Sequence, residues 1–103
     1  MTKGQRLKYD FTKGDLKLYD TNGKLTYRET SSGYWYKHEF DTNGKVIYCE
    51  DSRGYWDKYE YDTNGKETYQ EDSDGYWYKR EFDTNGNETY FENSQGFARH
   101  SIY

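Results

Sequence analysis

The segment Gly33-Tyr34-Trp35-Tyr36-Lys37-His38-Glu39-Phe40-Asp41-Thr42-Asn43-Gly44-Lys45 occurs three times in the chain with small changes. The second copy begins at Gly54 and the third at Gly75, so the period is 21 residues (75 − 54 = 54 − 33). A fixed period of this size is typical of tandem repeats in which each copy forms one supersecondary unit. The repeat therefore decides the architecture, although it does not identify a partner.

Two kinds of turn recur in each repeat. The first kind occupies residues 20–23, 41–44, 62–65 and 83–86, and the second occupies residues 30–33, 51–54, 72–75 and 93–96. Each begins with Asp, Asn or Thr and ends with Gly, which is typical of a type I turn followed by a glycine bulge. The segments between them are rich in aromatic and β-branched residues and show no helical spacing. The sequence predicts an all-β, antiparallel up-and-down meander of about ten strands.

The chain is short enough to form one domain of residues 1–103. Residues 1–19 are predicted to form a degenerate N-terminal cap, because terminal repeats lack a neighbour on one side. Four repeats follow, over residues 20–40, 41–61, 62–82 and 83–103.

The odd period of 21 conflicts with the alternation of side chains along a strand. If both turns keep the register, Tyr36 and Tyr48 share one face, Trp35 and Cys49 share the other, and Trp56 falls on the face opposite Trp35. Identical residues would then lie in different environments. We therefore expect one extra residue in each repeat, as a β-bulge or as a longer second turn, which would also give a coiled single sheet.

Composition and charge exclude several classes of function. The net charge is −4 with acids and bases interspersed, which argues against direct nucleic-acid binding. Cys49 is the only cysteine, so neither an intrachain disulfide nor a cysteine-based metal site is expected. The sequence contains neither the apolar run of a signal peptide nor a membrane-spanning segment, so we expect a cytoplasmic protein without membrane contact.

No cofactor, metal or catalytic site is expected. The Asp-x-Asn-Gly turns differ from calcium loops, because Gly comes fourth and a cation such as Lys45 takes the fifth position, where an oxygen ligand is needed. His38 and His100 occupy unrelated positions of the repeat, and no nucleophile with a partnering base recurs. The sequence therefore predicts a protein that is not an enzyme.

The segments at residues 40–45, 61–66 and 82–87, of the form Phe/Tyr-Asp-Thr-Asn-Gly-Lys/Asn, resemble the YD repeats of Rhs-type proteins. The resemblance covers residues 19–97 and implies β-hairpins that wind into a spiralling sheet. In that family such sheets form shells around toxin cargo or extracellular adhesive surfaces, and a chain of 103 residues is too short to enclose cargo. The aromatic hairpins are also similar, more weakly, to MORN-type repeats and to choline-binding repeats.

The candidate binding residues are Trp35, Trp56 and Trp77, together with Tyr36, Tyr59 and Tyr78. Trp and Tyr concentrate at interaction hot spots, so they predict a non-enzymatic module that binds another protein through an extended aromatic sheet face. The alternative for the tryptophans is a purely structural ladder of cross-strand contacts. A one-layer sheet also exposes a large aromatic surface, which a homo-oligomer formed through the Tyr-rich face would bury.

Two other functions are alternatives, the first through the Asp- and Glu-lined edges of the sheet and the second through the aromatic rings. A small acidic inhibitor, of the anti-defence type that phages or mobile elements encode, would block a functional or nucleic-acid-binding surface of its partner. Carbohydrate or choline binding would use the ladder of Trp and Tyr rings as a platform. The salt dependence of binding distinguishes the aromatic interaction module from the acidic inhibitor. A charge-driven complex weakens as ionic strength rises, and an aromatic one does not.

Overall fold

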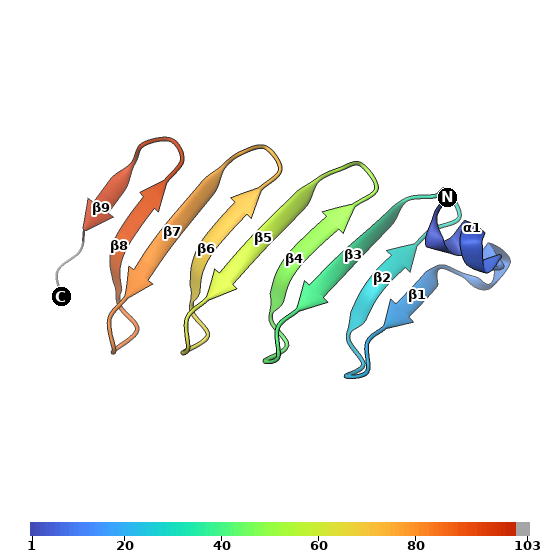
Figure 1. The fold of residues 1–103 in the computed structure, drawn as a ribbon, viewed down its shortest axis with the longest axis horizontal. Coiled ribbons are helices and arrows are strands. Elements are labelled where there is room, and N and C mark those ends of the chain that lie inside the picture. The colour runs from blue at the N-terminus through green and yellow to red at the C-terminus, as the bar shows by residue number, and fades with distance from the viewer. Residues whose placement is uncertain (101–103) are drawn as a thin grey trace. The chain divides into compact units, whose positions relative to one another are not determined.

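Nine strands follow one another in sequence order as an antiparallel meander, in a computed structural model that describes residues 1–100 (Figure 1). The meander does not close into a barrel, which confirms the predicted all-β fold with nine strands in place of about ten. The end of the last predicted repeat, residues 101–103, lies outside the described residues. The strands are β1 (Leu16–Tyr19), β2 (Leu25–Glu29), β3 (Trp35–Phe40), β4 (Val46–Asp51), β5 (Trp56–Tyr61), β6 (Glu67–Asp72), β7 (Trp77–Phe82), β8 (Glu88–Asn93) and β9 (Ala98–His100).

Two short helical segments precede the strands, namely α1 (Lys3–Leu7) and the 3₁₀ turn η1 (Phe11–Lys13). Both lie in the predicted cap, where the sequence indicated no helix. Thr2 and Gln5 form a capping box, in which the Gln5 amide donates to the Thr2 hydroxyl oxygen (3.1 Å) and the Thr2 amide donates to Gln5 Oε1 (2.8 Å). Among the described residues, no helix is long and apolar enough to cross a membrane.

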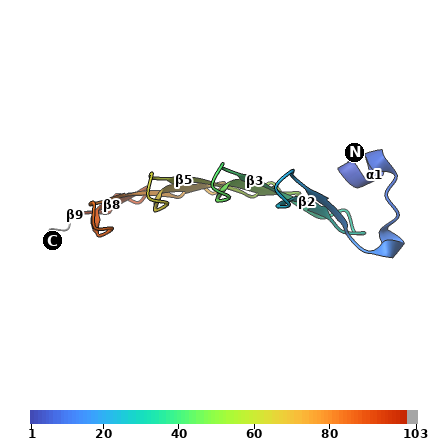
Figure 2. The ribbon, with the colours of Figure 1, turned by 90° about the horizontal axis from the view of Figure 1, so that it is seen from below.

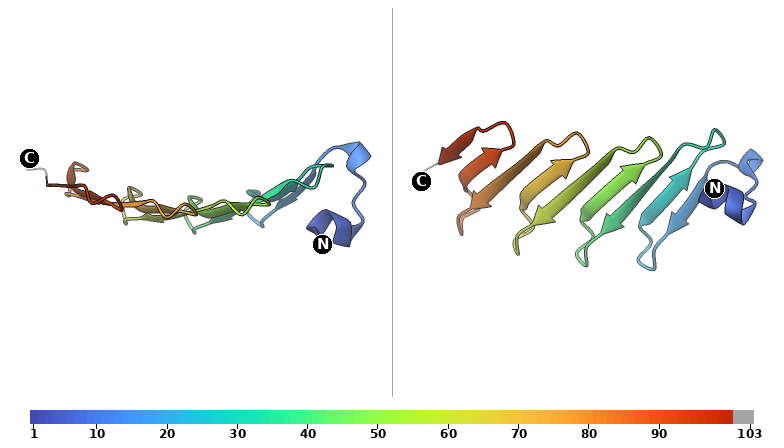
Figure 3. Two further views of the ribbon diagram at one scale, coloured as in Figure 1. Left: turned by 90° about the horizontal axis from the view of Figure 1, so that it is seen from above. Right: turned by 45° about the horizontal axis from the view of Figure 1, so that its top comes forward.

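The chain divides into two compact units. Unit 1 covers Met1–Tyr55 and contains α1, η1 and β1–β4, and unit 2 covers Trp56–Tyr103 and contains β5–β9. Seen edge-on, the strands within each unit form a single layer (Figure 2). In unit 1, α1 lies to one side of this layer, next to β1 and β2 (Figure 3).

The Asp-x-Asn-Gly turns have the predicted conformation. At residues 41–44, Asp41 Oδ1 accepts hydrogen bonds from the amides of Asn43 and Lys45, both at 2.9 Å. The Gly44 amide donates to the Asp41 carbonyl oxygen (3.0 Å), and Gly44 has φ = 83°. Gly occupies this position because a side chain is strained at positive φ.

A β-bulge supplies the extra residue that the odd period requires. In the hairpin of β5 and β6, Tyr61 faces Glu67 and Glu60 faces Tyr69, so Thr68 is left without an opposite residue. The Thr68 hydroxyl donates to the Glu60 carbonyl oxygen across the bulge (3.3 Å). The register shifts at the same place in the other hairpins closed by this kind of turn, at Thr26, Ile47 and Thr89, whereas the described hairpins closed by the second kind keep their register.

The bulge corrects the predicted faces of β4. With Ile47 as the extra residue, Tyr48 faces Glu39 and Cys49 faces His38. Tyr48 therefore lies on the face of Trp35, and Cys49 lies on the opposite face, because a shift of one residue exchanges the two sides of a strand. Trp56 and Trp77 share one face of unit 2, as equivalent repeats require.

Very few side chains are buried. Among the described residues, the buried side chains are those of Leu16, Tyr27 and Glu29, which are 6%, 5% and 2% exposed. All three lie on β1 and β2 in unit 1, whereas residues 56–100 of unit 2 contain no buried side chain. The only core of the described chain therefore lies where α1 meets the sheet.

Candidate functional site

The strand register defines two faces in each unit. We call the face that carries the tryptophans the tryptophan face, and the other side the opposite face. In unit 1 the tryptophan face consists of Leu16, Leu18, Tyr27, Glu29, Trp35, Lys37, Glu39, Tyr48 and Glu50. In unit 2 it consists of Trp56, Lys58, Glu60, Tyr69, Glu71, Trp77, Lys79, Glu81, Tyr90, Glu92, Ala98 and His100.

The six predicted binding residues do not form one surface. Trp35 in unit 1, and Trp56 and Trp77 in unit 2, lie on the tryptophan face of their units. Tyr36, Tyr59 and Tyr78 lie on the opposite face, because each stands an odd number of positions from the tryptophan of its own strand. The predicted residues are therefore divided between two aromatic surfaces, with the tryptophans on one face and the tyrosines on the other.

On the tryptophan face, Trp35 and Trp77 each stack on a tyrosine of the preceding strand. The ring centroids of Tyr27 and Trp35 are 5.9 Å apart with an interplanar angle of 28°, and those of Tyr69 and Trp77 are 6.4 Å apart at 22°. Such offset stacking stabilises a pair of rings beyond the area that they bury. The tryptophans therefore contribute to the structure of the sheet whether or not they also bind a partner.

A recurring Tyr-x-Glu motif accompanies the tryptophans. In every copy the tyrosine hydroxyl donates to the glutamate two residues later, at 2.8 Å (Tyr27 to Glu29), 2.9 Å (Tyr48 to Glu50), 2.9 Å (Tyr69 to Glu71) and 2.8 Å (Tyr90 to Glu92). Our sequence reasoning missed these glutamates, although their spacing of 21 residues was visible at positions 29, 50, 71 and 92.

Lysines of the neighbouring strand complete this pattern in two copies. The ammonium of Lys37 lies 3.5 Å from Glu50 Oε1, and that of Lys79 lies 3.3 Å from Glu92 Oε1. In both pairs the lysine and the glutamate are direct cross-strand partners. Each pair is partly exposed to solvent and therefore contributes little stability.

Glu29 is the buried member of the glutamate series, because α1 lies over it. Its carboxylate accepts hydrogen bonds from the Thr2 hydroxyl (2.6 Å), the Gly4 amide (2.8 Å) and the Tyr27 hydroxyl (2.8 Å). The Lys3 ammonium lies 5.5 Å from the centroid of the Tyr27 ring. The first copy of the motif is thus occupied by the segment of residues 2–4.

The ionisation of these groups reflects their surroundings. Burial and the Glu29 carboxylate together raise the pKa of Tyr27 to about 12. Burial alone would raise the pKa of Glu29, but the hydrogen bonds from Thr2, Gly4 and Tyr27 outweigh it, so this pKa lies below its ordinary value. Glu29 is therefore a charged carboxylate inside the only core of the described chain.

The opposite face carries a second group of rings. In unit 1, the rings of Tyr36 and His38 meet edge to face at 5.1 Å. Burial lowers the pKa of His38, which favours its neutral form. In unit 2, the Arg80 guanidinium lies 5.3 Å from the Tyr78 ring centroid and 5.5 Å from that of Phe82. Burial and a hydrogen bond to Glu67 raise the pKa of Tyr78 to about 12.

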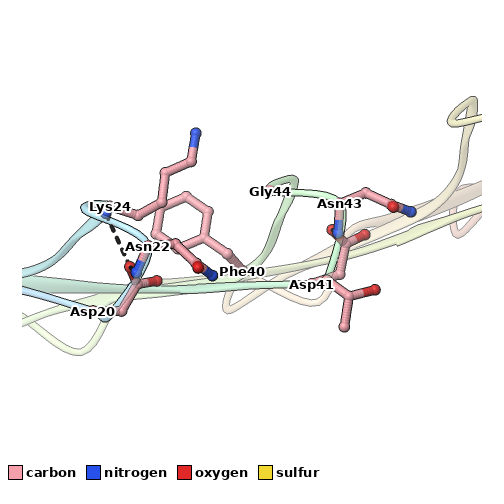
Figure 4. Close-up of a pocket in the computed structure, with 8 residues that line it drawn as sticks. Asp20, Asn22, Lys24, Phe40, Asp41, Asn43 and Gly44 are labelled. Carbon is pink, nitrogen blue, oxygen red and sulfur yellow. Dashed lines mark hydrogen bonds between the residues drawn. The ribbon is translucent and has the colours of Figure 1, made fainter.

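A groove lies between two successive turns of unit 1, with Phe40 between them and Lys24 above its ring (Figure 4). The Lys24 ammonium is 5.9 Å from the Phe40 ring centroid, and a Cβ added to Gly44 would lie 3.5 Å from Lys24 Cε. The Asp20 and Asp41 carboxylates already accept turn amides. The groove is thus a packing contact between turns. It is lined by Asp20, Asn22, Lys24, Phe40, Asp41, Thr42, Asn43 and Gly44.

Within residues 1–100, no three His, Cys, Asp or Glu side chains are grouped closely enough to hold a metal ion. Cys49 forms no disulfide. The chain matches no protein-family model, and a search of curated proteins found no relative. The geometry of the tryptophan face is therefore the basis for assigning a function.

Proposed function

We propose that this protein is a non-enzymatic interaction module that binds another protein through its tryptophan face. One observation carries the proposal: where a second layer covers this face, at Glu29, it produces the only buried side chains of residues 1–100. The same motif recurs in unit 2, half-buried and without a second layer among the described residues. A partner protein would supply the missing layer there.

The chemistry of the face suits a protein partner. Trp56 and Trp77 offer large apolar rings, and Lys58, Lys79, Glu71 and Glu92 surround them with both signs of charge. An aromatic centre within a polar rim is the common arrangement of protein–protein interfaces. The opposite face offers rings as well, but no segment of the described chain rests on it as α1 rests on Glu29.

The test compares two faces of the same strand. A protein captured by the immobilised chain would be identified and purified, and its affinity measured against Trp77→Ala and Phe82→Ala variants. Trp77→Ala should cost about 2 kcal/mol of binding free energy, which is roughly thirtyfold in affinity. Phe82→Ala, on the opposite face of β7, should bind normally, and both variants should keep a cooperative unfolding transition.

Three results would contradict this proposal. Equal affinity of Trp77→Ala and the unmodified protein would exclude the tryptophan face as the binding surface. A steep loss of affinity with added salt, together with an inert Trp77→Ala, would favour the acidic inhibitor instead. A loss caused by Phe82→Ala alone would place binding on the opposite face.

A further inference from the structure

The segment of residues 2–4 shows what kind of group the tryptophan face holds. One carboxylate, Glu29, receives both a side-chain hydroxyl from Thr2 and a backbone amide from Gly4. The Lys3 ammonium lies above the neighbouring Tyr27 ring. Gly4 approaches so closely that an added Cβ would lie 2.7 Å from Glu29 Oε2. The fit therefore requires a small residue at the position of Gly4.

Unit 2 contains the same arrangement of a tyrosine, a glutamate and a tryptophan. Tyr69 stacks on Trp77 as Tyr27 stacks on Trp35, and its hydroxyl donates to Glu71 as that of Tyr27 donates to Glu29. Tyr69, Glu71 and Trp77 are each half-buried, with no helix over them in the described part of unit 2. This copy is therefore open where the first copy is occupied.

Glu71 also has more free accepting capacity than Glu50 or Glu92. Its cross-strand partner is Lys58, whose ammonium lies over the Trp56 ring, 5.1 Å from the centroid. Among the described residues, the Tyr69 hydroxyl is the only hydrogen-bond partner of the Glu71 carboxylate. An ionised carboxylate can accept about four hydrogen bonds, so most of its capacity is available to a ligand.

We propose that the surface formed by Tyr69, Glu71 and Trp77 binds a partner segment of the Thr/Ser-Lys/Arg-Gly type. The segment donates a hydroxyl and a backbone amide to the Glu71 carboxylate, and it places its cation over the Tyr69 ring. This assignment rests on the proposed function and adds the chemistry of the partner to it. Hydrogen bonds to a carboxylate are the stronger kind, and a cation over an aromatic ring adds to them.

The neighbouring strand makes the second copy more polar than the first. β1 places Leu16 opposite Glu29 and Leu18 opposite Tyr27. β5 places Lys58 opposite Glu71 and Glu60 opposite Tyr69. A partner segment at Glu71 therefore carries polar or charged residues over β5, whereas β1 has leucines at the corresponding positions of the first copy.

The probe for this proposal is the N-acetylated peptide Met-Thr-Lys-Gly-Gln-Arg-Leu-Lys, which copies residues 1–8. It would be titrated into the protein of residues 1–103, in which the chain's own segment already occupies Glu29. Binding should move the indole N–H resonance of Trp77 to a saturable end point. The Glu71→Gln variant, which can still accept the Tyr69 hydroxyl, should bind the peptide about tenfold more weakly.

Matched controls separate the site from general charge effects. Asp74→Asn removes one exposed negative charge from the turn between β6 and β7, at a residue outside the three that form the surface, and should bind the peptide as the unmodified protein does. A peptide with valine in place of its glycine should bind at least about tenfold more weakly to the unmodified protein, since the added Cβ blocks the close approach that the amide needs to donate to the carboxylate. This peptide control does not depend on the folding of any variant.

Equal peptide binding to the Glu71→Gln variant, or no saturable shift of Trp77 in the unmodified protein, would overturn the proposal. If the peptide does not bind, but Trp77→Ala still lowers the affinity for a captured partner, the proposed partner chemistry is wrong and the proposed function stands. If the peptide binds at Glu71 while Trp77→Ala leaves partner affinity unchanged, the site is real and the proposed function is wrong.

Discussion

Glu29 shows how one carboxylate can organise an entire packing contact. A buried charge is costly unless hydrogen bonds replace the water that it loses. Thr2, Gly4 and Tyr27 provide three such bonds, and two of them come from the segment that covers the carboxylate. The negative charge of Glu29 makes its burial unfavourable, and the hydrogen bonds that offset this cost are also the ones that hold α1 in place.

The depressed pKa of Glu29 predicts a pH-dependent contribution to stability. The folded state favours the ionised form, so the contribution is fully present above the ordinary pKa of 4.5 and is lost as the pH falls through the lower folded-state value. At neutral pH, Glu29→Gln should lower the free energy of unfolding by about 1–3 kcal/mol. Urea unfolding of both proteins across acid pH would measure the difference.

The difference between the two proteins should shrink as the pH falls, because the unmodified Glu29 then becomes neutral as well. Glu39→Gln, an exposed carboxyl on the same face of unit 1, is the matched control and should change stability little. A difference that stays constant from neutral to acid pH would show that the charge of Glu29 does not hold α1.

At the scale of the element, the β-bulge decides which side chains share a face. The bulged residue is threonine in three of the four hairpins, and its hydroxyl bonds the carbonyl of the facing strand at Leu18, Glu60 and Glu81. Ile47 takes the position in the fourth hairpin without such a hydroxyl. The backbone geometry therefore persists without the threonine hydroxyl.

Deleting Thr68 should disrupt unit 2 far more than replacing it. The deletion moves Tyr69 and Glu71 to the opposite face, so Tyr69 can no longer stack on Trp77 unless the strands slip. Thr68→Val keeps the chain length and loses one exposed hydrogen bond, so it should cost about 0.5–1.5 kcal/mol. Near-ultraviolet circular dichroism would report the tryptophan packing, and urea unfolding would report stability.

A deletion variant with the same tryptophan spectrum and the same stability as Thr68→Val would contradict this role of the bulge. The proposed binding surface offers a second readout. The indole resonance of Trp77 should shift in the deletion variant even without ligand, whereas Thr68→Val should leave it nearly unchanged.

The sequence predicted the turns and strands well, because Asp-x-Asn-Gly carries its own turn chemistry and needs no distant contact. It also required one extra residue per repeat. It could not place that residue, since threonine is common in any strand and Ile47 shows no signal at all. This single shift moved Tyr48 and Cys49 between faces. The predicted binding residues lie on two faces for a simpler reason, because each tyrosine stands an odd number of positions from the tryptophan of its own strand.

The contact between α1 and the sheet was beyond prediction for a different reason. A helix of five residues is too short to show a hydrophobic period, and its one local signal was the capping box of Thr2 and Gln5. That Glu29 receives this segment depends on contacts across 25 and 27 positions of the chain. Sequence periodicity identifies the repeated glutamates but not which of them is covered.

At the scale of the whole molecule, the chain folds with almost no buried apolar side chains. Leu16 and Tyr27 are the buried hydrophobic residues among those described, and hydrophobic residues make up only 31% of the sequence. Stability must then come mainly from backbone pairing and cross-strand side-chain contacts. A protein of this kind leaves its ring surfaces accessible, which is the condition for binding through a sheet face.

The meander also has a consequence for the speed of folding. Within each unit every described pairing joins strands that are neighbours in sequence, so no pairing has to close a long loop first. Folding rates rise as contacts become more local, so refolding should be complete within milliseconds, faster than is usual for all-β domains. The chain has no proline, so a slow isomerisation phase is not expected either. Stopped-flow tryptophan fluorescence should therefore record refolding without a phase of tens of seconds.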